Sequence, residues 1–151
     1  TDRASHAYGG RRTRRTEPMY AQGGTAYVYL CYGVHHLFNV VTGPPGIPHA
    51  ILVRAMIPVA GLDTMARRRG REHFTTRGPG TLAQALGITT AYSGADLITG
   101  PIVIMDTGEE VPARSITSGP RIGVGYAGSD ALLPYRFRIP PSRAIPIPPA
   151  P

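Results

Sequence analysis

The sequence predicts a single α+β domain, in which a curved, mainly antiparallel β-sheet carries a protruding β-hairpin and a few short flanking helices. Residues 25–31 and 36–42 are β-rich runs joined by a few residues that include Gly33, which is the pattern of a hairpin. Residues 61–69 and 81–86 have the apolar spacing of short helices. The chain of 151 residues is long enough for one domain with its own core.

The tip of the predicted hairpin has an unusual composition. Residues 25–31 (TAYVYLC) alternate small or aliphatic side chains with tyrosines, as a half-buried strand does. The turn that follows carries Tyr32, Val34 and His35, where a hairpin normally has Asn, Asp, Gly or Ser. An aromatic and apolar tip on a basic protein indicates contact with something outside the fold.

The other predicted strands and loops are short. Residues 1–18 are polar and lack a hydrophobic period, so we expect a loop there. Residues 50–58 (AILVRAMIP) and 101–105 (PIVIM) predict apolar strands. Residues 121–126 (RIGVGY) predict a strand or a turn, and residues 135–139 (YRFRI) predict an exposed strand.

The predicted helices have recognisable ends. The helix at residues 81–86 is preceded by a proline and stopped by Gly87, as short helices often are. The helix at residues 61–69 ends in three arginines, which fit either the negative end of the helix dipole or a contact with phosphate. Residues 140–151 are proline-rich, and we expect a disordered tail after a domain of residues 1–139.

The composition limits the function. No apolar run approaches the length of a transmembrane helix, no signal-peptide pattern opens the sequence, and one cysteine excludes an internal disulfide. We therefore expect no membrane partner and a cytoplasmic location, at the nucleoid in a bacterium or in the nucleus of a eukaryote. The net charge is +7, and all 16 basic residues are arginines. Arginine grips phosphate with two donors, which favours nucleic acid, although a GC-rich coding sequence also replaces lysine by arginine.

Common metal and cofactor motifs are absent from the sequence. His35 and His36 are adjacent, so they point to opposite faces of a strand, and no cysteine pair accompanies them. There is no phosphate-binding P-loop, and the G-V-G at residues 123–125 lacks the later glycine of a dinucleotide site. We expect neither a metal nor a cofactor.

Two groups of arginines have alternative interpretations. Arg11 and Arg15 belong to a basic cluster beside the Gly9–Gly10 pair, which is typical of a flexible phosphate clamp or of a solvated tail. Arg54 lies in the middle of an apolar strand, where a guanidinium is costly unless it is paired or faces a cleft. The alternative is that Arg54 extends to solvent from an edge strand.

Motifs along nearly the whole chain resemble those of the methylpurine (alkyladenine, 3-methyladenine) DNA glycosylases. They occur in the order and spacing of that family: ASHAYGGRRTRR (4–15), MYAQGGTAYVYLCYGVHHLFNVVTG (19–43), ILVRAMIP (51–58), GLDTMARRR (61–69), GPGTLAQALGI (78–88) and RIGVGYAG (121–128). The resemblance implies a monomeric, metal-free enzyme of base excision repair. Such an enzyme flips an alkylated or deaminated purine out of double-stranded DNA and hydrolyses its glycosidic bond.

The resemblance also implies roles for residues around the hairpin. Tyr32 matches the side chain that intercalates into the duplex and fills the space left by the flipped base. His6 matches a polar partner of the base, and Tyr29 matches a stacking face. Asn39 matches the side chain that rejects guanine by crowding its exocyclic amine.

The remaining implied roles concern water and phosphate. Arg54 and the backbone carbonyl of Val124 match the groups that hold the attacking water. Contacts with the DNA backbone are expected from the basic loop and from the hairpin tip: Arg11, Thr13, Arg15, Val34 and His35.

One part of the family pattern is absent from these 151 residues. The family's general base is a glutamate in an E-T-E-A-Y segment shortly before the His6 motif, and this sequence begins after that point. None of the glutamates present stands in an equivalent context: Glu17, Glu72, Glu109 and Glu110. We therefore expect a glycosylase with impaired catalysis. The alternatives are a catalytically inactive DNA-binding module and a basic RNA-binding protein, for which no RNA-binding motif is present.

Overall fold

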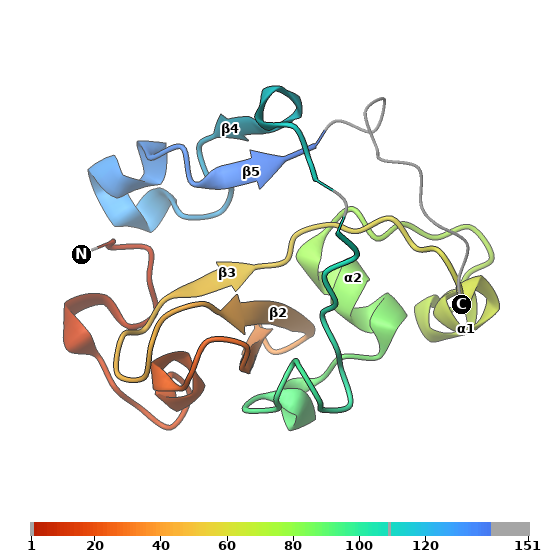
Figure 1. Cartoon of the computed structure of the whole chain (residues 1–151), viewed down its shortest axis with the longest axis horizontal. Helices are drawn as coiled ribbons and strands as arrows, with labels where there is room; N and C mark the ends of the chain where they lie inside the picture. Colours follow the sequence, from red (N-terminus) through yellow and green to blue (C-terminus); the bar gives the residue numbers. More distant parts are fainter. Residues whose placement is uncertain (1, 109, 140–151) are drawn as a thin grey trace. The chain divides into compact units, whose positions relative to one another are not determined.

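The computed structural model describes residues 2–108 and 110–139, so the predicted tail of residues 140–151 lies outside the described residues (Figure 1). The described residues form two compact units. One comprises Arg12–Met105, and the other combines the residues up to Arg11 with those from Asp106 onward. The division of the chain into a domain of residues 1–139 and a tail stays a prediction. The α+β class with antiparallel sheets is confirmed.

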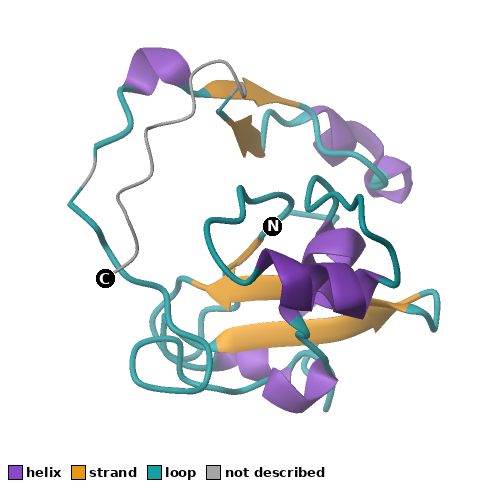
Figure 2. Cartoon of the chain, turned by 90° about the vertical axis from the view of Figure 1, so that its right-hand side faces the viewer, coloured by secondary structure: helices purple, strands orange, loops and turns teal. Residues whose placement is uncertain are grey.

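The Arg12–Met105 unit contains the predicted hairpin. Strands β1 (Ala26–Cys31) and β2 (His35–Val41) pair antiparallel, and β3 (Ala50–Leu52) pairs with the other edge of β2. Figure 2 shows the two long strands side by side with their connecting turn beyond the sheet. Both hairpin strands are therefore confirmed to within one residue at each end.

The core of this unit lies between one face of the sheet and the helix α2 (Pro79–Leu86). Val28 of β1 and Phe38 of β2 are directly paired, so their side chains lie on the same face and meet Ala83 of α2. Leu97, which is 1% exposed, completes the cluster. The period-2 alternation then directs the intervening residues of both strands to the opposite face.

Both predicted helices are confirmed, and each ends at a glycine. α1 (Leu62–Arg69) ends at Gly70, and α2 ends at Gly87, whose backbone adopts the left-handed φ of 72°. Glycine adopts this conformation without the steric cost of a side chain, so it stops the helix at a defined residue.

The other unit is built on a short two-stranded sheet. Strand β4 (Thr117–Gly119) pairs antiparallel with β5 (Arg136–Arg138), so the predicted strand at residues 135–139 is confirmed. Two 3₁₀ turns separated by a kink at Gly128 span Gly125–Leu132. Residues 121–124 form the turn before it, in agreement with the turn alternative of the prediction.

Two sequence predictions about the elements were wrong. Only residues 50–52 of the apolar run 50–58 form a strand, and residues 101–105 belong to neither sheet. An apolar run does not specify a pairing partner, and Ile104 makes only a loop-type bond to the Leu97 carbonyl. The loop at residues 1–18 also contains 3₁₀ turns, at Tyr8–Gly10 and from Glu17 onward.

Candidate nucleic-acid interface

The hairpin tip holds Tyr32 in an unusual conformation. Cys31 pairs with His35, and the Val34 N–H donates to the Cys31 carbonyl at 3.2 Å, which closes a tight turn. Both residues inside this turn have positive φ, 50° at Tyr32 and 72° at Gly33. Positive φ is common for glycine but costs a residue such as tyrosine about 1–3 kcal/mol. The Tyr32 side chain is 92% exposed, so packing does not offset this cost.

The hairpin is braced close to its tip. The Thr90 N–H donates to Nδ1 of His36 at 3.2 Å. Gly80 of α2 lies so near His35 that an added Cβ would come within 3.2 Å of its ring. Glycine at this position therefore permits α2 to approach the strand closely. Val34, 69% exposed, and Tyr32 extend beyond this support.

The sheet face opposite the core carries a polar and aromatic cluster. Tyr27 pairs with Asn39, and Tyr29 pairs with Leu37, so these four side chains share one face. The Asn39 side chain is buried and its Nδ2 donates to the backbone carbonyls of Tyr27 at 3.0 Å and Leu37 at 3.3 Å. The Tyr27 and Tyr29 ring centroids are 5.5 Å apart. The predicted stacking residue and the predicted filter against guanine thus lie on the same face.

Arg15 also reaches this face. Its guanidinium lies 4.9 Å from the centroid of the Tyr29 ring, a cation–π contact. Burial raises the pKa of the Tyr27 phenol above its ordinary value, and the nearby Arg15 opposes part of that rise. The structure therefore brings a residue predicted to contact phosphate next to one predicted to stack on a base. Sequence spacing gave no signal of this contact.

Arg54 follows the end of β3. The Val53 N–H donates to the Phe38 carbonyl at 3.0 Å, and the Val53 side chain packs against the core. Arg54 is half-buried, and it makes no hydrogen bond or ion pair with any residue of the described ranges 2–108 and 110–139. Both interpretations of Arg54, facing a cleft and extending to solvent, stay predictions.

The basic loop is an ordered turn. Thr16 is buried, and its hydroxyl accepts the Thr13 N–H at 2.8 Å, while the Thr16 N–H donates to the Thr13 carbonyl at 3.0 Å. This turn leaves Arg14 and Arg15 exposed. Arg12 instead forms an exposed, two-bond ion pair with Glu17, at 2.6 and 2.9 Å. The basic residues are therefore exposed on an ordered turn, so the phosphate clamp and the solvated tail both stay predictions.

The two remaining predicted site residues belong to the other unit. His6 is half-buried within a series of turns that begins at Asp2. The Val124 carbonyl accepts the Ala127 N–H at 2.9 Å. A carbonyl oxygen has two lone pairs, so this bond leaves one for a water molecule.

The sequence profile of the methylpurine-DNA glycosylase (MPG) family matches residues 1–143. The chain belongs to the methylpurine-DNA glycosylase family. It is 46% identical to a Chlamydia abortus protein over 90% of this chain and 72% of that protein. It is 44% identical to a Chlamydia pneumoniae protein, over 93% and 72%. A Bacillus cereus (strain AH820) protein is 43% identical, over 90% and 72%. All three relatives carry the name "Putative 3-methyladenine DNA glycosylase".

In this glycosylase-family chain, the arginines at the end of α1 hold α2. Arg68 Nη1 donates to the Leu86 carbonyl at 2.8 Å and to the Ala85 carbonyl at 3.3 Å, at the C-terminal end of α2. The adjacent Arg69 donates to the side-chain oxygen of Gln84. The contacts of this run therefore favour a structural role over phosphate contact.

Arg68→Ala is expected to lower the free energy of unfolding by about 1 kcal/mol, because two carbonyls at a helix end lose a charged donor. Chemical denaturation measures this change. The matched control is Arg67→Ala, since Arg67 is exposed and donates to Thr64 of its own helix. Equal losses for the two variants would contradict the capping role.

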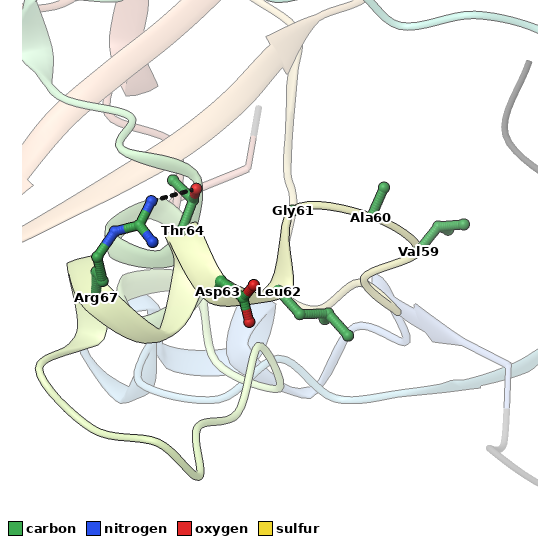
Figure 3. A pocket seen from close by; sticks show the side chains of 7 residues that line it. All are labelled: Val59, Ala60, Gly61, Leu62, Asp63, Thr64 and Arg67. Carbon is green, nitrogen blue, oxygen red and sulfur yellow. Dashed lines mark hydrogen bonds between the residues drawn. The ribbon is translucent and has the colours of Figure 1, made fainter.

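An open hollow at the start of α1 does not belong to this interface. Its lining is shown in Figure 3: Val59, Ala60, Gly61, Leu62, Asp63, Thr64 and Arg67. None of the predicted site residues lines it. Among the residues that the structure describes, no three His, Cys, Asp or Glu side chains gather in a group that could hold a metal. Within the same residues, no helix has the length and apolar character needed to span a bilayer.

Proposed function

We propose that this family member flips alkylated or deaminated purines out of double-stranded DNA, as a monomer, and hydrolyses the bond between base and sugar. The observation that carries the proposal is Tyr32, 92% exposed at the hairpin tip with a positive φ of 50°. An enzyme that acts on a base must take it out of the stack. A protruding aromatic side chain suits the wedge that fills the vacated space. The close approach of Gly80 in α2 to His35 supports the hairpin next to this side chain.

The face opposite the core is the proposed surface for the flipped base. Tyr29 offers an aromatic ring for stacking, and His6 is assigned a polar contact from the sequence match. Asn39 is 6% exposed and held by two hydrogen bonds, so it has little freedom to move away from a bulkier base. This supports rejection of guanine by a clash with its exocyclic amine. A base that stacks on the covered side of Tyr29 would displace Arg15 toward the DNA backbone.

The DNA backbone is the proposed partner of the basic loop. Arg11, Thr13 and Arg15 are exposed and lie within five consecutive residues, which suits adjacent phosphates. Val34 and His35 are exposed beside the wedge and would contact the duplex around it.

The proposed chemistry is hydrolysis by a positioned water molecule. The water oxygen bonds to the sugar C1′, the bond from C1′ to the purine nitrogen breaks, and its electron pair leaves with the base. The family resemblance assigns a contact with this water to Arg54 and another to the Val124 carbonyl, and the water's proton needs a general base.

Single-turnover base release tests both parts of the proposal. The substrates are duplexes with hypoxanthine or ethenoadenine, and the product is an alkali-sensitive abasic site. We expect base release from the lesion duplex and none from an undamaged duplex of the same sequence. No release and no preferential binding of the lesion would contradict the function.

A catalytically inactive DNA-binding module is the second candidate. The ordered basic loop and the hairpin favour it, together with the absence of a partner for Arg54 within the described residues. It predicts lesion binding without base release. The logarithm of the DNA-binding constant should fall linearly with the logarithm of salt concentration, with a slope of about −0.9 for each phosphate that the protein neutralises. A flat salt response would contradict both candidates.

A further inference from the structure

We propose that Asp2 and Arg121 are positioning residues that hold the His6 segment and the Val124 turn in a fixed relation to each other. The inference rests on the proposed function, because it concerns the residues assigned there to the base and to the water. It adds two residues that the resemblance does not assign. All four residues belong to the unit that combines the start of the chain with the residues from Asp106 onward.

The ion pair between Asp2 and Arg121 is bidentate. Arg121 Nη1 donates to Asp2 Oδ2 at 2.5 Å, and Nη2 donates to Asp2 Oδ1 at 2.9 Å. The Asp2 side chain is 28% exposed and the Arg121 side chain is 19% exposed, so both are largely withdrawn from solvent. Two parallel bonds fix the angle between the groups as well as their distance.

Further contacts join the same two segments. Arg121 Nη2 also donates to the Asp130 carbonyl at 2.9 Å, and the Arg3 N–H donates to Asp130 Oδ2 at 2.8 Å. The Tyr126 hydroxyl donates to the Ala4 carbonyl at 3.3 Å. The bond from Arg121 to Asp130 lies within the later segment, whereas the ion pair and the contacts of Arg3 and Tyr126 connect residues 119–127 positions apart in the chain. The segments are thus held at several points, with the ion pair as the charged contact among them.

The ion pair lies close in the chain to both functional groups, the His6 side chain and the Val124 carbonyl. Asp2 Oδ1 accepts the Ala4 N–H at 3.0 Å, and the Ser5 N–H donates to the Asp2 carbonyl at 3.0 Å, so Asp2 also shapes the turn before His6. Val124 follows Arg121 by three residues, and its carbonyl direction is set by the bond from Ala127 at 2.9 Å.

The ion pair is suited to positioning more than to stability. Partly exposed ion pairs contribute little to the free energy of folding, because the charges are well solvated when they separate. The hydrogen bonds from Arg121 hold the pKa of the Asp2 carboxyl below its usual range. The pair therefore persists at neutral pH. Its contribution is complete above the unfolded-state pKa of about 3.9 and is lost as the pH falls through the lowered folded-state pKa.

Amide hydrogen exchange tests whether the Asp2–Arg121 ion pair holds the two segments together, independently of any DNA activity. In Asp2→Asn, we expect faster exchange at Ala127, whose N–H bonds to Val124, while the melting temperature of the chain hardly changes. Asp2→Glu keeps the carboxylate and should restore part of the protection. The control is Glu17→Gln, which removes the same charge from the exposed pair with Arg12. Unchanged exchange at Ala127 in Asp2→Asn would overturn the proposal.

Binding to DNA tests the functional consequence. The readout is the ratio of affinities for a hypoxanthine duplex and an undamaged duplex at one salt concentration. We expect Asp2→Asn to lower this ratio at least tenfold, with undamaged-duplex affinity within twofold of the parent chain, and Glu17→Gln to leave the ratio unchanged. A ratio retained in Asp2→Asn would overturn the positioning role. If the parent chain itself shows no lesion preference, the proposed function fails. The exchange experiment still decides whether the Asp2–Arg121 ion pair holds the two segments together.

Discussion

Replacing Tyr32 with alanine is expected to reduce lesion recognition by about 100-fold, because the wedge that offsets a few kcal/mol of unstacking is lost. The side chain is 92% exposed, so its removal leaves no cavity and the fold should be retained. The measurement is the affinity for a lesion duplex, together with single-turnover base release. The matched control is Phe137→Ala, an aromatic residue that is 68% exposed on β5 and has no assigned contact with DNA.

Tyr32→Asn separates the wedge from the conformation of the turn. Asn followed by Gly33 is a preferred pair for a hairpin turn in which both residues have positive φ. This variant should raise the free energy of unfolding by about 1 kcal/mol, because asparagine adopts the left-handed conformation more readily than tyrosine. It should lose lesion recognition as Tyr32→Ala does. A variant at Tyr32 that binds and releases the lesion at the parent rate would contradict the wedge.

Replacing Asn39 with alanine is expected to weaken the rejection of guanine by about 10-fold or more, because the crowding group is removed. The same change leaves the carbonyls of Tyr27 and Leu37 without their side-chain donor and should cost about 1–2 kcal/mol of stability. The measurement is the ratio of guanine to hypoxanthine release, or the corresponding ratio of affinities. An unchanged ratio would show that Asn39 has only the structural role of bridging strands.

Asn39→Asp keeps the shape of the side chain but removes its N–H donors. An ionised carboxylate would lie beside two carbonyl oxygens at a 6% exposed position, so we expect a loss of about 3 kcal/mol at neutral pH. Such burial raises the pKa of a carboxyl group, so the loss should be smaller at pH 4, where the protonated acid can donate. The rejection of guanine should remain. A pH-independent loss of stability would contradict this account of the Asn39 environment.

Local sequence patterns predicted the elements that are organised by neighbouring residues. The hairpin follows from two alternating runs around a short turn, and the helices that end at Gly70 and Gly87 follow from apolar spacing and a left-handed stop. The apolar runs at residues 50–58 and 101–105 were predicted as strands, but only residues 50–52 form one. Their pairing depends on residues elsewhere in the chain, which composition alone does not identify.

The sequence identified candidate residues of the site, but it did not predict the contacts between their side chains. The resemblance located Tyr29, Asn39 and Arg54, but it gave no reason to expect Arg15 over the ring of Tyr29. It also left the role of the arginines after Met65 open, until the bonds from Arg68 to the end of α2 favoured a structural one. Side-chain contacts between distant segments depend on packing, which no local pattern contains.

The sequence by itself therefore determined the family, the positive charge, the hairpin with Tyr32 at its tip and the identities of the candidate site residues. Only the tertiary structure decided the positive φ that holds Tyr32, the close approach of α2 at Gly80, and the pairing of Asp2 with Arg121 across 119 positions of the chain. The physical reason is one of range. Propensity and periodicity act over a few residues, whereas backbone strain, close packing and ion pairing are set by which distant segments the folded chain brings together.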